Sequence, residues 1–168
     1  MPIIVKQNTT NHITIDFFNK LTGQETLHPL ISLVNYKYSK EISKLHAVCD
    51  LYGLIYGSQY IKFIRPGEVL DIAALQATTA NKYTGVLFHP DLLCETTLEE
   101  YIDKLSLPNC YGVDLSGHDQ QVISQCLNDI EKELQHSIDT HSSKIIVSCI
   151  ELLLNYCSRF SHNCRCNQ

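Results

Sequence analysis

The feature that most constrains this chain is the segment 144–160, which is apolar over most of its circumference if it is helical. Except for Arg159, its polar residues recur at steps of four, three, four and three, so they form one narrow stripe of a helix; they are Lys144, Ser148, Glu151, Asn155 and Ser158. A helix with so thin a polar stripe must be covered on two sides. The chain's own core can cover one side, and we predict that the same helix of a second copy covers the other.

A second amphipathic segment precedes this one. Residues 118–136 carry apolar side chains on one helical face, and Ser116-Gly117-His118-Asp119 suits a helix cap. The connection 137–142 is short and polar, which favours antiparallel neighbours. The sequence therefore predicts a helical hairpin over 118–160 that forms a homodimer. We expect its interface to contain Ile145, Cys149, Leu152, Leu153, Tyr156 and Phe160.

The N-terminal half consists of short apolar runs separated by turn residues. Residues 12–18 alternate with period two, and further runs fall at 30–38, 45–56, 59–64, 69–76 and 82–88. Regular short strands with such punctuation indicate an antiparallel barrel or sandwich, because closing the sheet removes its exposed edges. We predict a β-barrel over 12–90.

After residue 90 the pattern becomes helical. Thr97-Leu98-Glu99-Glu100 fits a capping box for a short helix that ends near Leu105. With the hairpin, the helical part spans 97–160. Strands followed by helices give an α+β fold, and 168 residues suit a single domain over 1–168.

Composition excludes several classes of protein. The chain is 44% hydrophobic and 18% charged, as in globular domains, and its net charge of −5 with 13 scattered Lys and Arg residues offers no basic surface for nucleic acid. It lacks an apolar run long enough to span a membrane and an N-terminus that resembles a signal peptide. We therefore expect a cytoplasmic protein whose eight cysteines are structural thiols.

Four segments are informative together. They are 65–68 (RPGE), 85–93 (GVLFHPDLL), 130–139 (IEKELQHSID) continuing into 141–144 (HSSK), and 150–160 (IELLLNYCSRF). In this order they resemble the N-terminal sensor half of bacterial AraC-type (AraC/XylS) transcriptional regulators. The resemblance covers about residues 27–162, although Gly85 lacks the Trp that the family places beside it.

This resemblance implies a cupin-like, jelly-roll-like barrel that holds a small effector, followed by a helix pair that dimerises. Members of the family reach DNA through a C-terminal domain with two helix-turn-helix units. Only eight residues follow Phe160, too few for any DNA reader. We therefore expect DNA contact only through a C-terminal domain that is absent from this chain, which is either an isolated sensor domain or a naturally truncated protein.

Residues of the predicted strands supply candidate ligand contacts. Arg65 at a strand end can pair with a carboxylate, although it equally suits an exposed turn. His89 can bond a ligand, although His-Pro-Asp also suits a strand exit. The tyrosines and Phe63 combine apolar rings with hydroxyl groups but also suit a core. The candidate ligand-binding set is Tyr36, Tyr38, Tyr56, Phe63, Arg65 and His89.

We expect no metal, cofactor or enzymatic activity. Metal-dependent cupins use a His-x-His pair with a later Glu, and another His after a Pro-Gly turn. Here Pro66-Gly67 is followed by Glu68, Val69 and Leu70, and the sequence contains no His-x-His. His162-Asn163-Cys164-Arg165-Cys166 offers soft ligands without a second cluster, which suits a frayed end. No catalytic triad or phosphate loop is present.

Three hypotheses follow. The first is an effector-sensing and dimerising domain of a transcription regulator, with an unidentified small molecule bound in the barrel. The second is a stand-alone cupin-like small-molecule-binding protein or enzyme. The third is a ligand-free dimerisation module whose barrel is filled by its own side chains. Fold analogy alone does not separate the first from the third.

Overall fold

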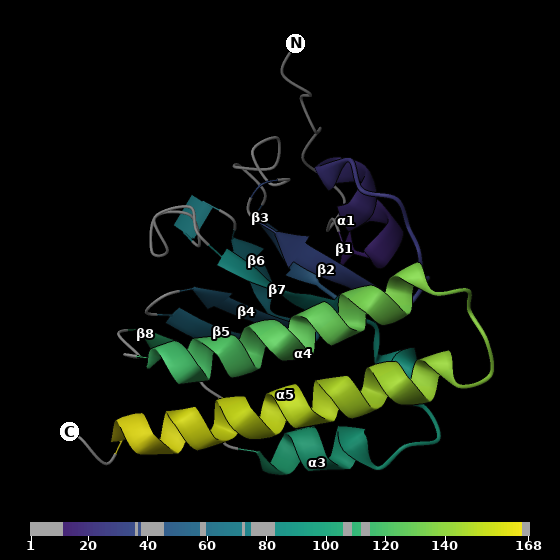
Figure 1. Ribbon diagram of the computed structural model, residues 1–168. Coiled ribbons are helices and arrows are strands. Elements are labelled where there is room, and N and C mark those ends of the chain that lie inside the picture. The colour runs from purple at the N-terminus through teal and green to yellow at the C-terminus, as the bar shows by residue number, and fades with distance from the viewer. Residues whose placement is uncertain are drawn as a thin grey trace.

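The computed structural model of the protein describes residues 12–35, 37, 46–57, 60–71, 73–74, 83–105, 109–111 and 115–165, and it contains two β-sheets and a set of helices (Figure 1). The smaller sheet has the strand order β1-β3-β6, and the larger has the order β2-β7-β4-β5-β8. Only the β1–β3 pair is parallel among the described pairs. The strands are β1 (His12–Ile13), β2 (Ile31–Asn35), β3 (His46–Cys49), β4 (Tyr52–Gly57), β5 (Tyr60–Ile64), β6 (Val69–Asp71), β7 (Tyr83–Phe88) and β8 (Asn109–Tyr111).

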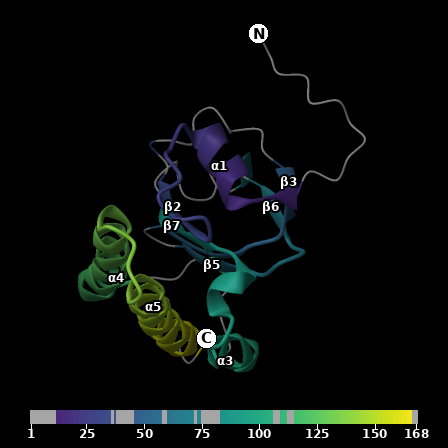
Figure 2. The ribbon, with the colours of Figure 1, turned by 90° about the vertical axis from the view of Figure 1, so that its right-hand side faces the viewer.

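Both faces of the larger sheet are buried. Alternate residues along each strand point to opposite faces, so Val86 and Phe88 of β7 enter one core while Tyr83 and Leu87 enter the other. The first core is closed by the C-terminal helices, and the second by the smaller sheet and helix α1 (Ile15–Thr22). The result is three layers, with the larger sheet in the middle (Figure 2).

The space between the two sheets is filled by the protein itself. Tyr83, Leu87 and Ile55 of the larger sheet are at most 1% exposed, and they pack against Cys49 and Ile13 of the smaller one. The two sheets are open in the described part of the chain, and no closed barrel is seen there. The predicted α+β class is confirmed, whereas the barrel is not.

Helix α1 replaces most of a predicted strand. Residues 12–18 alternate in hydropathy, yet only β1 is extended, and the helix begins after Thr14, whose Oγ1 accepts a hydrogen bond from the Phe17 amide. Gly23 ends the helix in the left-handed conformation, which glycine adopts at little cost. Ile15 and Phe18 are buried with a spacing of three, so a helix buries this segment as effectively as a strand would.

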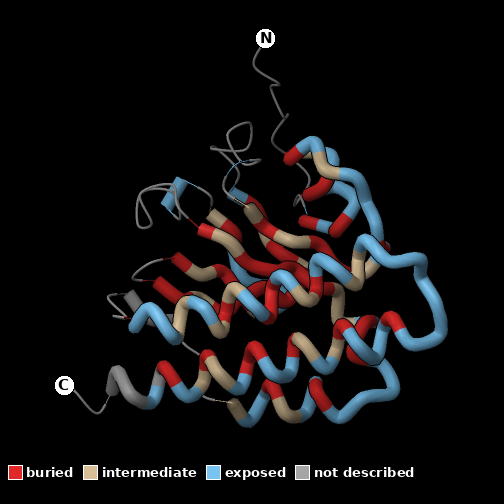
Figure 3. Tube along the Cα trace, viewed as in Figure 1, coloured by how far each residue is buried: buried red, intermediate tan, exposed pale blue. Residues whose placement is uncertain are grey.

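The C-terminal hairpin forms as predicted. Helices α4 (Gly117–Gln135) and α5 (Ser142–Arg165) pack side by side across the larger sheet (Figure 1). Ser116 and Asp119 form a reciprocal capping box at the start of α4. The tube coloured by burial shows buried stretches recurring between exposed ones along both helices (Figure 3), and the buried residues belong to the core beneath the larger sheet.

A short 3₁₀ turn, η3 (Pro90–Leu93), and helix α3 (Leu98–Lys104) complete the helical layer. The predicted helix at 97–105 is thus present, but its predicted capping box is wrong, because the Thr97 side chain makes no cap hydrogen bond. Thr96 accepts from the Leu98 amide instead, at 3.3 Å. No helix among the described residues is long and apolar enough to cross a membrane.

Candidate ligand cleft and outer helix face

A cleft of about 460 Å³ lies between helix α4, the edge strand β2 and the loop that joins α1 to β2. It is formed outside the filled core between the sheets. Its apolar lining comes from Leu27 of the loop, from Ile31 and Leu33 of β2, and from Leu127 and Leu134 of α4. This volume and this mixture of apolar and polar walls are those of a small-molecule site.

Helix α4 supplies the polar rim of the cleft. Asn128, Glu131 and Gln135 are spaced three and four residues apart, which places them on one helical face. Within the described part of the chain these three side chains have no hydrogen-bond partner. Glu25 of the loop, which also lines the cleft, has none there either. These side chains are free to bind a ligand without first breaking an internal bond.

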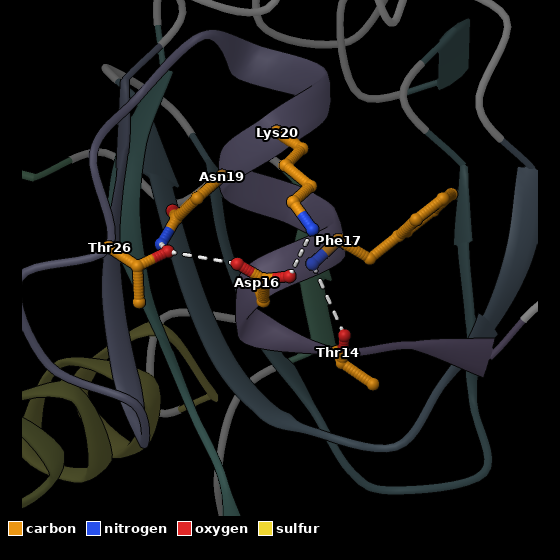
Figure 4. Close-up of polar contacts among 6 residues, drawn as sticks. All are labelled: Thr14, Asp16, Phe17, Asn19, Lys20 and Thr26. Carbon is orange, nitrogen blue, oxygen red and sulfur yellow. Dashed lines mark hydrogen bonds and ion pairs between the residues drawn. The ribbon is translucent and has the colours of Figure 1, made fainter.

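The back wall is held rigid by a polar network (Figure 4). The Asn19 amide group of α1 donates to Thr26 Oγ1 at 3.0 Å, and its carbonyl oxygen accepts from Ser32 Oγ of β2. Thr26 Oγ1 also donates to Asp16 at 3.5 Å, and Asp16 pairs with Lys20 at 2.7 Å. Asn19 is only 2% exposed. These bonds join α1, the loop and β2 into one wall.

The edge of β2 adds backbone groups to the cleft. The His89 amide donates to the Leu30 carbonyl at 2.8 Å, so this opposed pair is a hydrogen-bonded one. Hydrogen-bonded and non-bonded pairs alternate along an antiparallel ladder. Ile31, Leu33 and Asn35 therefore point their amide and carbonyl groups away from β7, toward the edge of β2 that pairs with no other described strand.

A second, shallower hollow follows the N-terminal half of α4 and shares Ser124 and Asn128 with the cleft. Tyr56 of β4 lines it, and its hydroxyl lies 3.3 Å from Ser124 Oγ. This contact joins the larger sheet to α4. Of the predicted ligand residues, Tyr56 is the one that the structure places in a described hollow.

The other predicted ligand residues do not converge with Tyr56. Phe63 is buried against Tyr52, with ring centroids 5.9 Å apart. Arg65 stacks over Phe63 and contacts Asp103 of α3 at 3.4 Å, so it joins β5 to the helical layer. His89 Nδ1 accepts from the Asp91 amide and caps η3, as expected for a strand exit. Tyr36 and Tyr38 lie outside the described residues.

The six predicted interface residues divide between two faces of α5. Leu153 and Phe160 are 0% and 6% exposed and belong to the chain's own core, so they are not available to a second copy. Ile145 and Leu152 are 43% and 50% exposed, and Cys149 and Tyr156 are half-buried. These last four, spaced four, three and four residues apart, define the outer stripe of α5.

Charged groups flank the outer stripe. The Arg159 guanidinium lies over the Tyr156 ring, 5.4 Å from its centroid. Burial, followed by the charges of Asp129 and Glu133 on α4, raises the pKa of the Cys149 thiol. The stripe thus has a cation toward the C-terminal end of α5 and carboxylates beside its N-terminal half.

The Cys126, Cys149 and Cys157 thiols of the hairpin are structural. Burial, reinforced by the neighbouring Cys149, raises the pKa of Cys126 to about 11, and burial also raises the pKa of Cys157. Thiols with such raised pKa values stay protonated and are poor nucleophiles and metal ligands. In the described part of the chain, no group of three or more His, Cys, Asp or Glu side chains is placed to hold a metal ion.

Comparisons of the chain with protein-family models, with curated proteins and with solved structures found no match.

Proposed function

We propose that this chain is the effector-sensing and dimerising domain of a bacterial, cytoplasmic transcription regulator of the AraC type, in which DNA is bound by a separate C-terminal domain. The observation that carries the proposal is the position of α4. One face of this helix lines the cleft, and another packs along α5, which carries the outer stripe. A ligand in the cleft therefore contacts the element that supports the dimer face.

In this proposal the two sheets are an opened form of a cupin-like barrel, and the effector binds beside the larger sheet. The space between the sheets is filled by side chains such as Leu87 and Ile55, which leaves no room for a ligand there. Binding alters dimerisation only if the ligand has different affinities for two arrangements of the hairpin. This coupling is supported by the lining of the cleft, because its two walls belong to different layers.

The proposed dimer pairs α5 with α5 of a second copy about a two-fold axis near Leu152. An isologous contact is self-complementary, so the residue seven positions after the axis faces the residue seven positions before it. Arg159 then faces the partner's Ile145, beside the carboxylates of α4. At each end of the paired apolar stripes, a positive charge of one copy thus lies near negative charges of the other.

The test is a change of charge on the outer stripe. Ile145→Glu places a carboxylate in the proposed apolar contact and should weaken the dimer at least about tenfold, a cost of roughly 1.4 kcal/mol or more. Ile138→Glu is the matched control, because Ile138 is 61% exposed in the loop between α4 and α5, outside the stripe. Light scattering over a dilution series measures both dissociation constants.

A monomeric wild-type chain at all concentrations would overturn the dimer proposal. Equal weakening by both variants would show that charge acts through folding or solubility instead of the stripe. Loss of the dimer in Ile145→Glu alone supports the assigned face.

A ligand-free dimerisation module is the second candidate, because the core between the sheets is filled. Native mass spectrometry of the purified chain separates the two. A dimer that carries an organic adduct supports the sensor, and a dimer that never retains or binds a small molecule supports the module.

A further inference from the structure

Among the described residues, the cleft is lined by charges of one sign. Its described lining contains two carboxylates, Glu25 and Glu131, and no Lys or Arg side chain. The lysines on the neighbouring helices are directed elsewhere: Lys20 pairs with Asp16 at 2.7 Å, and Lys132 contacts Asp129 at 3.3 Å. An anionic ligand would therefore bind next to two like charges with no described cation to compensate them.

The uncharged polar groups of the rim can both donate and accept hydrogen bonds, so acceptors for a donor head group are present. Asn128 and Gln135 each contribute a side-chain carbonyl to the rim, and Leu33 and Asn35 direct backbone carbonyls to the open edge of β2. An ammonium group has three donors and no acceptor. A carboxylate such as Glu131, together with nearby carbonyls, can satisfy these donors.

The floor of the cleft is apolar and therefore suits a different part of the ligand. Leu27, which is 44% exposed, lies with Leu127, Leu134 and Leu33 along the same hollow. Covering these side chains with an apolar group removes apolar surface from water and favours binding. A ligand that satisfies both parts has an apolar body and a donor head.

We propose that the effector cleft binds a small organic cation, a protonated amine on an apolar body, with the ammonium group paired to Glu131 and the body on the leucine floor. This inference rests on the proposed function for the cleft's link to dimerisation. Binding itself does not depend on that link.

Three probes of matched size test the head group: 4-phenylbutylamine, 4-phenylbutan-1-ol and 4-phenylbutyrate. They share a phenyl group on a chain of four carbons and differ in the charge and hydrogen-bonding groups of the head. Titration of the purified chain, followed by ¹H–¹⁵N NMR, should give the lowest dissociation constant for the amine and the highest for the carboxylate, with shifts at α4 and β2. Equal or tighter binding of the carboxylate, or shifts confined to other elements, would overturn the inference.

Glu131→Gln removes the proposed counter-charge and keeps the shape of an exposed side chain. The amine should then bind about twofold to fivefold more weakly, while the alcohol is unaffected. Glu151→Gln is the matched control, because Glu151 is exposed on α5 and does not line the cleft. An unchanged affinity of the Glu131→Gln variant for the amine would contradict the pairing.

Failure of this inference and failure of the sensor proposal give different results. Amine binding through Glu131 with an unchanged dimer constant supports the cation site and removes its regulatory role. No amine binding, together with a dimer that Ile145→Glu dissociates, overturns the cation site and leaves the dimer face standing.

Discussion

Gly85 lies at the centre of the larger sheet, where β7 passes β4 so closely that no side chain fits. A Cβ atom at this position would lie 2.0 Å from the Leu54 carbonyl oxygen and 3.0 Å from Cα of Ile55. Both are backbone atoms of a paired strand, so neither can rotate away. Glycine is required at position 85 because a larger side chain would clash with β4. The conformational freedom of glycine matters less here.

We therefore expect Gly85→Ala to lower the free energy of unfolding by about 3 kcal/mol, the upper range for overpacking a closed core. Gly117→Ala is the control, because a Cβ there meets nothing within 4 Å and the residue begins α4. That variant should change stability by less than about 0.5 kcal/mol. Urea unfolding followed by circular dichroism measures both. Similar stability of the two variants would contradict the close approach of β7 to β4.

At the scale of elements, helix α5 carries two apolar faces, one buried in the core and one exposed. Its sequence alone does not tell them apart. Leu152 and Leu153 are adjacent and chemically identical, yet they are 50% and 0% exposed. A period of 3.6 residues identifies apolar positions, whereas the side that meets the sheet is decided by how the helix docks. Periodicity therefore predicted the hairpin and its bounds closely, but it placed Leu153 and Phe160 at an interface when they belong to the core.

The two leucines give a direct test. Leu153→Ala should cost about 2–5 kcal/mol of unfolding free energy, because it leaves a cavity in a packed core. Leu152→Ala should leave the stability of the monomer within about 0.5 kcal/mol and instead weaken the dimer. Urea unfolding at two protein concentrations separates these effects, since only a dimer's stability depends on concentration. A large loss for Leu152→Ala in the dilute monomer would show that this residue is part of the core.

The cleft is a second feature that could not be predicted from the sequence alone. Asn128, Glu131 and Gln135 have the composition of a solvated helix face, and only the placement of β2 and the loop opposite them creates a hollow. The sequence instead offered Phe63 and Arg65 as ligand candidates, but Arg65 stacks on Phe63 and contacts Asp103 of α3. The signal in the sequence is a run of polar residues at helical spacing beside the apolar face that packs toward the sheet. It becomes informative only once the docking of α4 is known.

For the whole molecule, the arrangement of charges determines how two copies can meet. With a net charge of −5, two copies repel each other at long range. The proposed two-fold contact offsets this locally, because Arg159 of each copy approaches the partner's Glu133 at both ends of the stripe. A parallel pairing of the same stripes would instead bring the two Arg159 side chains together. Charge thus favours the antiparallel arrangement over the parallel one.

This arrangement predicts a dependence on salt. Raising the NaCl concentration from 50 mM to 500 mM screens the two exposed pairs and should weaken the dimer about fivefold. Arg159→Gln should weaken the dimer at low salt and abolish that dependence, whereas Lys20→Gln removes one positive charge from α1, on the other side of the larger sheet, and should preserve it. Analytical ultracentrifugation at both salt concentrations provides the dissociation constants. A dimer that instead tightens with salt and is unaffected by Arg159→Gln would be held together by apolar contact alone. The orientation of the two α5 helices must then be set by Leu152 and Tyr156.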